Sequence, residues 1–187
     1  RGTSAGEPRV TVAEQGSTAN ASDSMGSVLS VSAPLIIARG GSISSATTGG
    51  FDDDGNASDS GQGAGGAINI QARRIDAKDF QVSSRSEGSG TAGNIIIAAS
   101  RDLLLRNSSV TAESDQSDGG DVSLQAGRVL LVTDGTVTTR ANGTGGNLTI
   151  SAPPLLILDG QFEANAIEAE GGNIQLRSAR LARTESS

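Results

Sequence analysis

A short phrase, Gly-Gly-x-apolar-x-apolar (Ala-Gly in one copy), recurs along the chain at nearly constant spacing. The first apolar residue of each copy is, in chain order, Ile68, Ile95, Val122, Leu148 and Ile174. The steps between them are 27, 27, 26 and 26 residues. Repeats of this length are typical of solenoids, in which each unit buries its apolar face only by stacking on its neighbours. This recurrence constrains the fold more strongly than any single motif does.

Within each unit, apolar and polar residues alternate with the period of two that is typical of strands. In the unit 93–119 we expect strands at 94–98, 103–105 and 109–112, with turns at 100–102 and 106–108. Three short strands per coil of 26–27 residues, without a helical segment, predict an all-β fold, a parallel β-helix. The handedness rule for parallel crossovers makes it right-handed.

The whole chain, 1–187, is expected to be one β-helix segment of a longer secreted chain. The step from Leu29 to Ile68 is 39 residues, so the first full coil carries an insertion, which we place at 46–65. Insertions on solenoids often form the binding face. This one holds hard oxygen ligands of the kind that Ca²⁺ prefers. Two interpretations stay open, a solvated acidic loop and a Ca²⁺ site formed by Asp52, Asp54, Asn56 and Asp59.

Stacking places equivalent residues above one another, so columns carry more information than local motifs. The nearly constant spacing places five glycines in one column: Gly66, Gly93, Gly120, Gly146 and Gly172. We expect these glycines to supply positive φ at a tight corner. The residue that follows four of these glycines carries an amide or a carboxylate: Asn94, Asp121, Asn147 and Asn173. Such side chains, stacked at the interstrand distance, predict a structural ladder of hydrogen bonds from coil to coil.

A second column is basic and is interrupted by Pro154: Arg74, Arg101, Arg128 and Arg180. One interpretation is a strip that binds sulfated or sialylated glycans or phosphate head groups, because guanidinium groups recognise such anions. The alternative is a row of solvated turn residues, each paired with an acid such as Asp76 or Asp102.

Composition limits the chemistry that this chain can perform. The absence of His and Cys excludes imidazole bases, thiol nucleophiles and Cys/His zinc sites. The net charge of −7 disfavours a nucleic-acid partner, and no apolar run reaches the roughly 20 residues of a membrane-spanning helix. The outward residues of the first strands offer no carboxylate pair, so we expect no enzyme and no cofactor other than Ca²⁺.

The run Gly-Gly-Asn-Leu-Thr-Ile-Ser-Ala at 145–152, followed by Leu-Leu-Ile-Leu at 155–158 and a polar strand, is similar to the passenger repeats of filamentous haemagglutinin-like proteins. The resemblance covers most of the chain, from about Ser27 to Leu181. These proteins are large exoproteins of Gram-negative bacteria, including cyanobacteria, exported by two-partner secretion. The amino-terminal secretion domain of the family carries Asn-Pro-Asn motifs, and this chain has no Asn-Pro. The resemblance therefore implies a shaft segment and an outer-membrane transporter as export partner.

We accordingly expect a secreted, surface-located adhesin stalk that mediates attachment to cells, glycans or matrix, or takes part in a biofilm. Two alternatives from other classes remain. A filament subunit could stack end to end through uncapped coils. A glycan-cleaving β-helix enzyme would need an acidic cluster that the sequence does not show.

Overall fold

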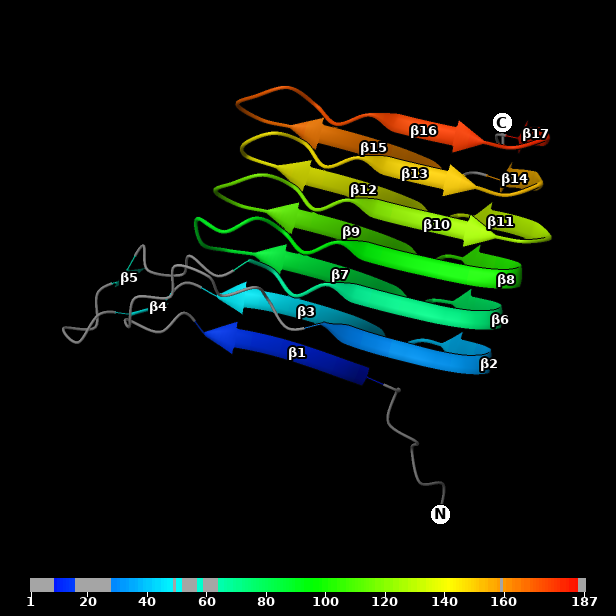
Figure 1. Cartoon of the computed structure of the whole chain (residues 1–187), viewed down its shortest axis with the longest axis horizontal. Coiled ribbons are helices and arrows are strands. Elements are labelled where there is room, and N and C mark those ends of the chain that lie inside the picture. The colour runs from blue at the N-terminus through cyan, green and yellow to red at the C-terminus, as the bar shows by residue number, and fades with distance from the viewer. Residues whose placement is uncertain are drawn as a thin grey trace, which may run out of the picture.

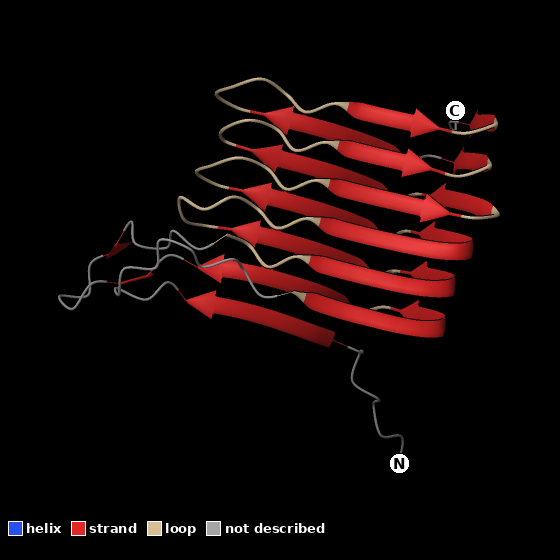
Figure 2. Cartoon of the chain, viewed as in Figure 1, coloured by secondary structure: helices blue, strands red, loops and turns tan. Residues whose placement is uncertain are grey.

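The computed structural model describes residues 9–15, 28–48, 50–51, 57–58, 64–158 and 160–184. This part of the chain is built from strands and contains no helix (Figure 2). Nearly all strand pairs are parallel, and successive coils stack into a flat-sided rod (Figure 1). The near strands run to the right, the far strands run back to the left, and the chain climbs from N to C, so the coil is right-handed. The predicted all-β parallel β-helix is confirmed.

Two parallel sheets form the walls of the rod. The six-stranded sheet contains the third strand of each coil, in the order β1 (Arg9–Gln15), β3 (Ser42–Thr48), β7 (Gln81–Ser86), β9 (Ser109–Ser114), β12 (Thr136–Ala141) and β15 (Gln161–Ala166). The nine-stranded sheet contains β2 (Leu29–Arg39), β6 (Ile68–Lys78), β8 (Ile95–Arg106), β10 (Val122–Ala126), β11 (Val129–Thr133), β13 (Leu148–Ser151), β14 (Pro154–Leu158), β16 (Ile174–Arg177) and β17 (Arg180–Thr184). Each coil therefore crosses between the two sheets and returns.

The nine-stranded sheet bends sharply, and here the structure differs in detail from the expected strands. In the first three coils the expected first and second strands form one continuous bent strand, as in β8, where a turn at 100–102 is expected. In the later coils the same bend interrupts the strand, as between β10 and β11. The difference arises because the backbone stays extended through the corner, where a β-bulge between β6 and β8 bends the strand, so the sequence signal for a turn is ambiguous there.

The repeating phrase sets the register of the stack. Ile68 pairs with Ile95, Ile95 with Val122, Val122 with Leu148, and Leu148 with Ile174. The first apolar residues of all five copies therefore lie in one column. Residues at equivalent positions of successive coils form the other buried columns. One column contains Ile97, Leu124 and Ile150, another contains Leu103 and Leu130, and a third contains Val110 and Val137. The interior is a stack of layers of branched aliphatic side chains, as the alternation predicts.

Leu29 pairs with Ile68 in adjacent coils, although 39 residues separate them. The stacked pairing is thus the same as between coils that are 26 or 27 residues apart, and residues 46–48 of the expected insertion belong to the stacked strand β3. Within the expected insertion, β4 (Gly50–Phe51) pairs with β5 (Ala57–Ser58), and this pair is antiparallel. The expected Ca²⁺ ligands Asp52, Asp54, Asn56 and Asp59 lie outside the described residues, so that site stays a prediction.

The glycine column has a different cause from the one expected. Among the described residues, the only glycines with positive φ are Gly40 and Gly41, which belong to another turn. A Cβ at Gly93, Gly120 or Gly146 would instead lie 2.1–2.4 Å from a glycine carbonyl oxygen of the preceding coil. The expectation of positive φ is wrong for these described glycines, because close backbone approach between coils, and not a left-handed turn, excludes every side chain there.

Small polar side chains of the opposite sheet line the same narrow corner. The hydroxyl of Ser84 donates to the carbonyl oxygen of Gly66 at 3.1 Å and accepts the N–H of Gly93 at 2.9 Å. Two coils later, the hydroxyl of Thr139 donates to the carbonyl oxygen of Gly146 at 2.6 Å. Both side chains are fully buried. These bonds satisfy polar groups that the close approach of the two sheets removes from water.

Positive φ occurs at the turn between the second and third strands. Asp79, Asn107 and Asp134 have φ of 54°, 45° and 49°, and Gly40 precedes them in the same column. Asn and Asp tolerate this conformation better than other residues that carry a Cβ. This turn explains why each coil has Gly, Asn or Asp at that point.

Gly120→Ala tests the origin of the glycine column. Its Cβ would lie 2.3 Å from the carbonyl oxygen of Gly93, so two coils must separate. We expect the free energy of unfolding, measured by urea titration, to fall by about 1–3 kcal/mol or more. Gly171→Ala is the control, because its Cβ meets only the carbonyl oxygen of Ala164, at 3.1 Å. Equal losses in the two variants would contradict the close-approach explanation.

Candidate functional site

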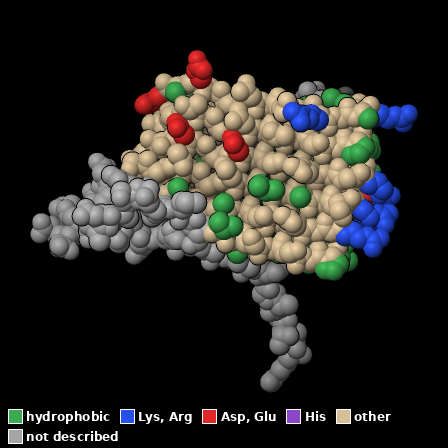
Figure 3. Space-filling model, in the orientation of Figure 1, with side chains coloured by type: hydrophobic (Ala, Val, Ile, Leu, Met, Phe, Trp, Pro, Cys, Tyr) green, Lys and Arg blue, Asp and Glu red, His purple; other side chains and the backbone are tan. Residues whose placement is uncertain are grey.

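Cationic side chains gather at the bend of the nine-stranded sheet, along one edge of the molecule (Figure 3). A groove on this edge is lined by four arginines, one carboxylate and two apolar residues, and we call it the basic corner: Arg73, Arg74, Arg101, Arg128, Asp102, Pro34 and Leu35. The arginines come from β6, β8 and the turn before β11. Three successive coils therefore contribute to one surface.

A β-bulge shapes the basic corner. Ala72 pairs with Ala99, but Arg74 pairs with Asp102, so β8 has one more residue than β6 at this point. Ser100 and Arg101 thus lie opposite Arg73. Bulges redirect side chains and are frequent beside binding sites. The extra residue carries Arg101 to the outside of the bend.

The expected single column of arginines is wrong in register. Because of the bulge, Arg74 is in line with Asp102 and not with Arg101. Arg101 is instead adjacent to Arg128, whose N–H donates to the Arg101 carbonyl oxygen at 2.7 Å. Arg180, in β17, pairs with Pro154 and does not line the groove. A bulge changes the count of residues along one strand, which alignment by a constant repeat length cannot detect.

Arg128 and Asp102 form a two-point ion pair. The Arg128 Nε and Nη2 atoms lie 2.7 and 2.5 Å from the Asp102 Oδ1 and Oδ2 atoms. The Asp102 side chain is only 7% exposed, whereas that of Arg128 is 58% exposed. The hydrogen bond from Arg128 lowers the pKa of Asp102, and its charge together with those of Arg101 and Arg74 acts in the same direction against the effect of burial. The same hydrogen bond raises the pKa of Arg128.

A second carboxylate on the same edge is surrounded by cations. Asp76 lies 2.7 Å from Arg106, 3.3 Å from Arg39 and 3.6 Å from Arg74. One carboxylate therefore faces three guanidinium groups, so this face keeps an excess of positive charge. The expected pairing of turn arginines with Asp76 and Asp102 thus holds for Arg74 and Arg128 only.

The guanidinium groups of Arg73 and Arg101 make no hydrogen bond or ion pair with the described part of the chain. Both guanidinium groups are exposed at the surface of the groove. Arg73 is absent from the column of arginines expected from the sequence, because the repeat length alone does not place it opposite Arg101; the bulge does so. Two unpaired guanidinium groups on adjacent coils can bind the oxygens of a sulfate, carboxylate or phosphate group.

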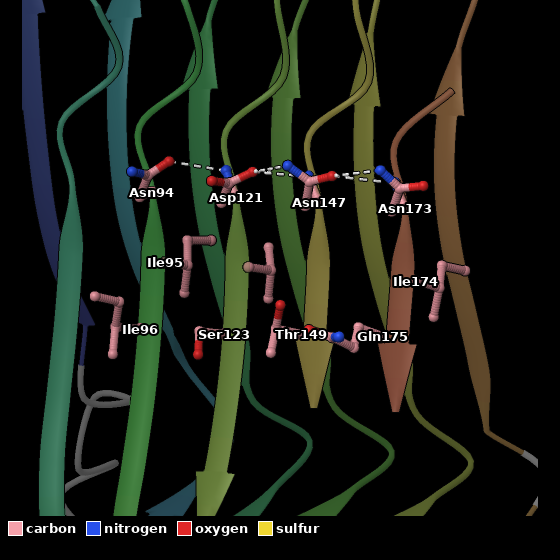
Figure 4. Close-up of a pocket in the computed structure, with 11 residues that line it drawn as sticks. Asn94, Ile95, Ile96, Asp121, Ser123, Asn147, Thr149, Asn173, Ile174 and Gln175 are labelled. Atoms are coloured by element: carbon pink, nitrogen blue, oxygen red, sulfur yellow. Dashed lines mark hydrogen bonds between the residues drawn. The ribbon is translucent and has the colours of Figure 1, made fainter. Parts of the chain in front are cut away.

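The amide ladder consists of Asn94, Asp121, Asn147 and Asn173, each directly before one of the strands β8, β10, β13 and β16 (Figure 4). The side-chain oxygen of each residue accepts the backbone N–H of the next, at 2.8 Å from Asp121 to Asn94, 2.7 Å from Asn147 to Asp121, and 3.2 Å from Asn173 to Asn147. The Asn147 and Asn173 amide groups also donate to the oxygen of the preceding member. The ladder therefore extends the hydrogen bonding of the sheet by one residue at the amino-terminal end of each of these strands.

A shallow groove beside the amide ladder is lined by Ile96, Ser123, Thr149 and Gln175 (Figure 4). These side chains are uncharged, and the ladder groups are already hydrogen-bonded to one another. Among the described residues that line this groove, the charged one is Asp121, whose Oδ1 atom already accepts two N–H groups of Asn147. The basic corner presents two guanidinium groups without a partner in the described part of the chain, so it is the better candidate site.

No group of three or more acidic, His or Cys side chains suited to a metal ion occurs among the described residues. The described residues also include no helix that could cross a membrane. No family model matches the chain, and neither the curated proteins nor the solved structures contain a significant match.

Arg128→Ala tests the electrostatics of the basic corner. Because the pKa of Asp102 is lowered by folding, the ion pair stabilises the fold above the ordinary carboxyl pKa of about 4 and this stabilisation is lost as the pH falls through the lowered value. At pH 7 the variant leaves a buried carboxylate without its partner, so we expect the free energy of unfolding to fall. The loss should shrink as the pH falls and Asp102 is protonated.

The measurement is the free energy of unfolding at several pH values between 7 and 3, determined for the variant and for the unmodified protein. Arg128→Ala combined with Asp102→Asn is the control, because it has no carboxylate to titrate. Its difference from Asp102→Asn alone should not depend on pH. A deficit of Arg128→Ala that is the same at every pH would show that packing, and not the ion pair, is lost.

Proposed function

We propose that this chain is a rigid segment of a secreted bacterial surface adhesin and that its basic corner binds anionic groups of glycans or of the extracellular matrix. The observation that carries the proposal is the pair of exposed, unpaired guanidinium groups of Arg73 and Arg101 on adjacent coils. Coils repeat at about 4.8 Å, so successive cations can contact successive anionic groups of an extended polymer. The stacked sheets hold these cations in fixed positions, which limits the entropy lost on binding.

The resemblance of the repeats to filamentous haemagglutinin-like exoproteins supports the adhesin and its surface location. A shaft requires stiffness along its axis, and the uninterrupted hydrogen bonding from β2 to β16 and β17 supplies it. Export through an outer-membrane transporter belongs to the same proposal. The basic corner then provides contact sites on the side of the shaft and not only at its tip.

Binding of heparin, a sulfated polysaccharide, tests the proposal by biolayer interferometry, with uncharged dextran as the ligand control. We expect binding to heparin that weakens with salt, because released counterions contribute to the affinity. Arg73→Ala combined with Arg101→Ala should weaken it at least about tenfold, since a charge-assisted hydrogen bond contributes about 1.5–3 kcal/mol. Arg140→Ala is the matched control, because Arg140 lies on the other sheet and is 3.9 Å from Glu113.

Equal heparin affinity in the double variant and in Arg140→Ala would contradict a role for the basic corner. Absence of heparin binding by the folded protein would leave a shaft without lateral contacts and would remove the binding part of the proposal.

One observation favours a second function, a filament subunit that stacks end to end. Ile174 and Leu176 belong to the outermost described coil of the first strand and are 45% and 41% exposed, whereas their partners Leu148 and Ile150 are fully buried. Another solenoid coil would cover them. Leu176→Glu should then abolish any fibres that the protein forms at high concentration, as seen by negative-stain electron microscopy. Fibres that persist in this variant would argue against end-to-end stacking.

A further inference from the structure

Charges are segregated between the two edges of the rod (Figure 3). The edge at the bend carries the basic corner and the cations around Asp76. The opposite edge, where the third strands turn towards the glycine column, carries exposed carboxylates that we call the acidic edge: Asp118, Glu168 and Glu170. The protein is therefore an electrostatic dipole across its width, in addition to its net charge of −7.

The carboxylates of the acidic edge have no cationic partner among the described residues. Asp118 accepts the backbone N–H of Thr144 at 2.8 Å, which does not neutralise its charge. By contrast, Glu113 near the end of β9 and Asp115 just after β9 are paired with Arg140 and Arg85. Unpaired negative charge thus faces one side and unpaired positive charge faces the other.

The two sets of charges have different steps along the solenoid axis. Arg73 and Arg101 lie on adjacent coils, separated by the interstrand distance of about 4.8 Å. The acids lie in the loops after β9 and after β15, which are two coils apart, and Glu168 and Glu170 share one loop. A second copy that lies parallel to the first can therefore bring Glu168 and Glu170 of one loop against the two unpaired guanidinium groups.

We propose that two copies of this chain associate side by side, with the basic corner of one copy against the acidic edge of the other. The basic corner is formed by the coils of β6, β8 and β11, whereas the acidic edge lies in the later coils, from the loop after β9 to the loop after β15. The copies are therefore staggered along the rod axis. Such a contact is heterologous and does not close, so further copies can add and form a sheet of parallel rods.

This association depends on ionic strength in a defined way. The contacts are exposed charges, which salt screens over a Debye length of about 10 Å at 0.1 M. The net negative charge of each copy opposes association. Side-by-side pairing is therefore expected at low salt and is lost at high salt. End-to-end stacking through Ile174 and Leu176 is apolar and has the opposite response, because it is not weakened by screening.

Sedimentation velocity of the complete 187-residue chain, at about 0.02 M and about 0.5 M NaCl, tests the proposal. Two charge-reversed variants are compared with the unmodified protein, Arg73→Glu with Arg101→Glu and Glu168→Lys with Glu170→Lys. Circular dichroism confirms that each retains its strands. Leu176→Glu serves as the control that removes the apolar end contact and leaves both edges intact.

We expect the unmodified protein and Leu176→Glu to associate at low salt and to be monomeric at high salt. Each charge-reversed variant alone should lose most of this low-salt association. A mixture of the two in equal amounts should recover it, because each variant's basic corner or its replacement is then opposite in charge to the other variant's edge. A monomeric unmodified protein at low salt, or association that persists in either charge-reversed variant, would overturn the proposal.

The outcome is distinguishable from that of heparin binding. The acidic-edge variant retains Arg73 and Arg101, so it should bind heparin at least as tightly as the unmodified protein while it fails to associate with itself. Both proposals are supported if the arginine variant loses heparin binding and self-association and the acidic-edge variant loses self-association only. Unchanged self-association in the acidic-edge variant refutes side-by-side pairing and leaves heparin binding untouched.

Discussion

The close approach of glycine backbones in successive coils is the constraint on which the rest of the structure depends. Gly93, Gly120 and Gly146 leave no space for a Cβ, because the carbonyl of the preceding coil occupies it. At this corner the hydroxyl groups of Ser84 and Thr139, from the opposite sheet, bond directly to the glycine backbone. The corner sets the register, and the register aligns every column of the core and of the surface.

The repeat length and the alternation of apolar residues predicted the architecture because both follow directly from stacking. The pairing of Ile95 with Val122 and of Val122 with Leu148 is the spacing of the phrase itself. The reason for the glycines was not predictable in the same way. Positive φ and close approach both require glycine, and a sequence does not distinguish them. The two reasons are distinguished only by the position of the carbonyl group of the preceding coil, which the structure gives.

At the candidate site, the sequence repeat likewise predicts only part of the arrangement of charged side chains. A constant repeat places Arg74, Arg101 and Arg128 in one column, but one extra residue at Ser100–Arg101 moves Arg74 into line with Asp102. Arg101, and Arg73 opposite it, are left without an ion pair in the described part of the chain, whereas Asp102 is bound by Arg128 of the next coil, in the register of the constant repeat. The presence of a basic edge was therefore predictable, whereas the division into paired and unpaired cations depends on a bulge that the sequence pattern does not reveal.

The register between coils is most directly tested by disulfide cross-linking, since the chain has no cysteine of its own. Ser123 and Thr149 are paired across adjacent strands and lie side by side on the outer face (Figure 4), with Cα atoms about 4.8 Å apart, within the range that a disulfide can bridge. Ser123→Cys with Thr149→Cys should form an intramolecular disulfide rapidly under mild oxidation. Ser123→Cys with Ser151→Cys, two residues out of register and about 8 Å apart, should not. Cross-linking of the second pair in preference to the first would contradict the stacked register on which this account rests.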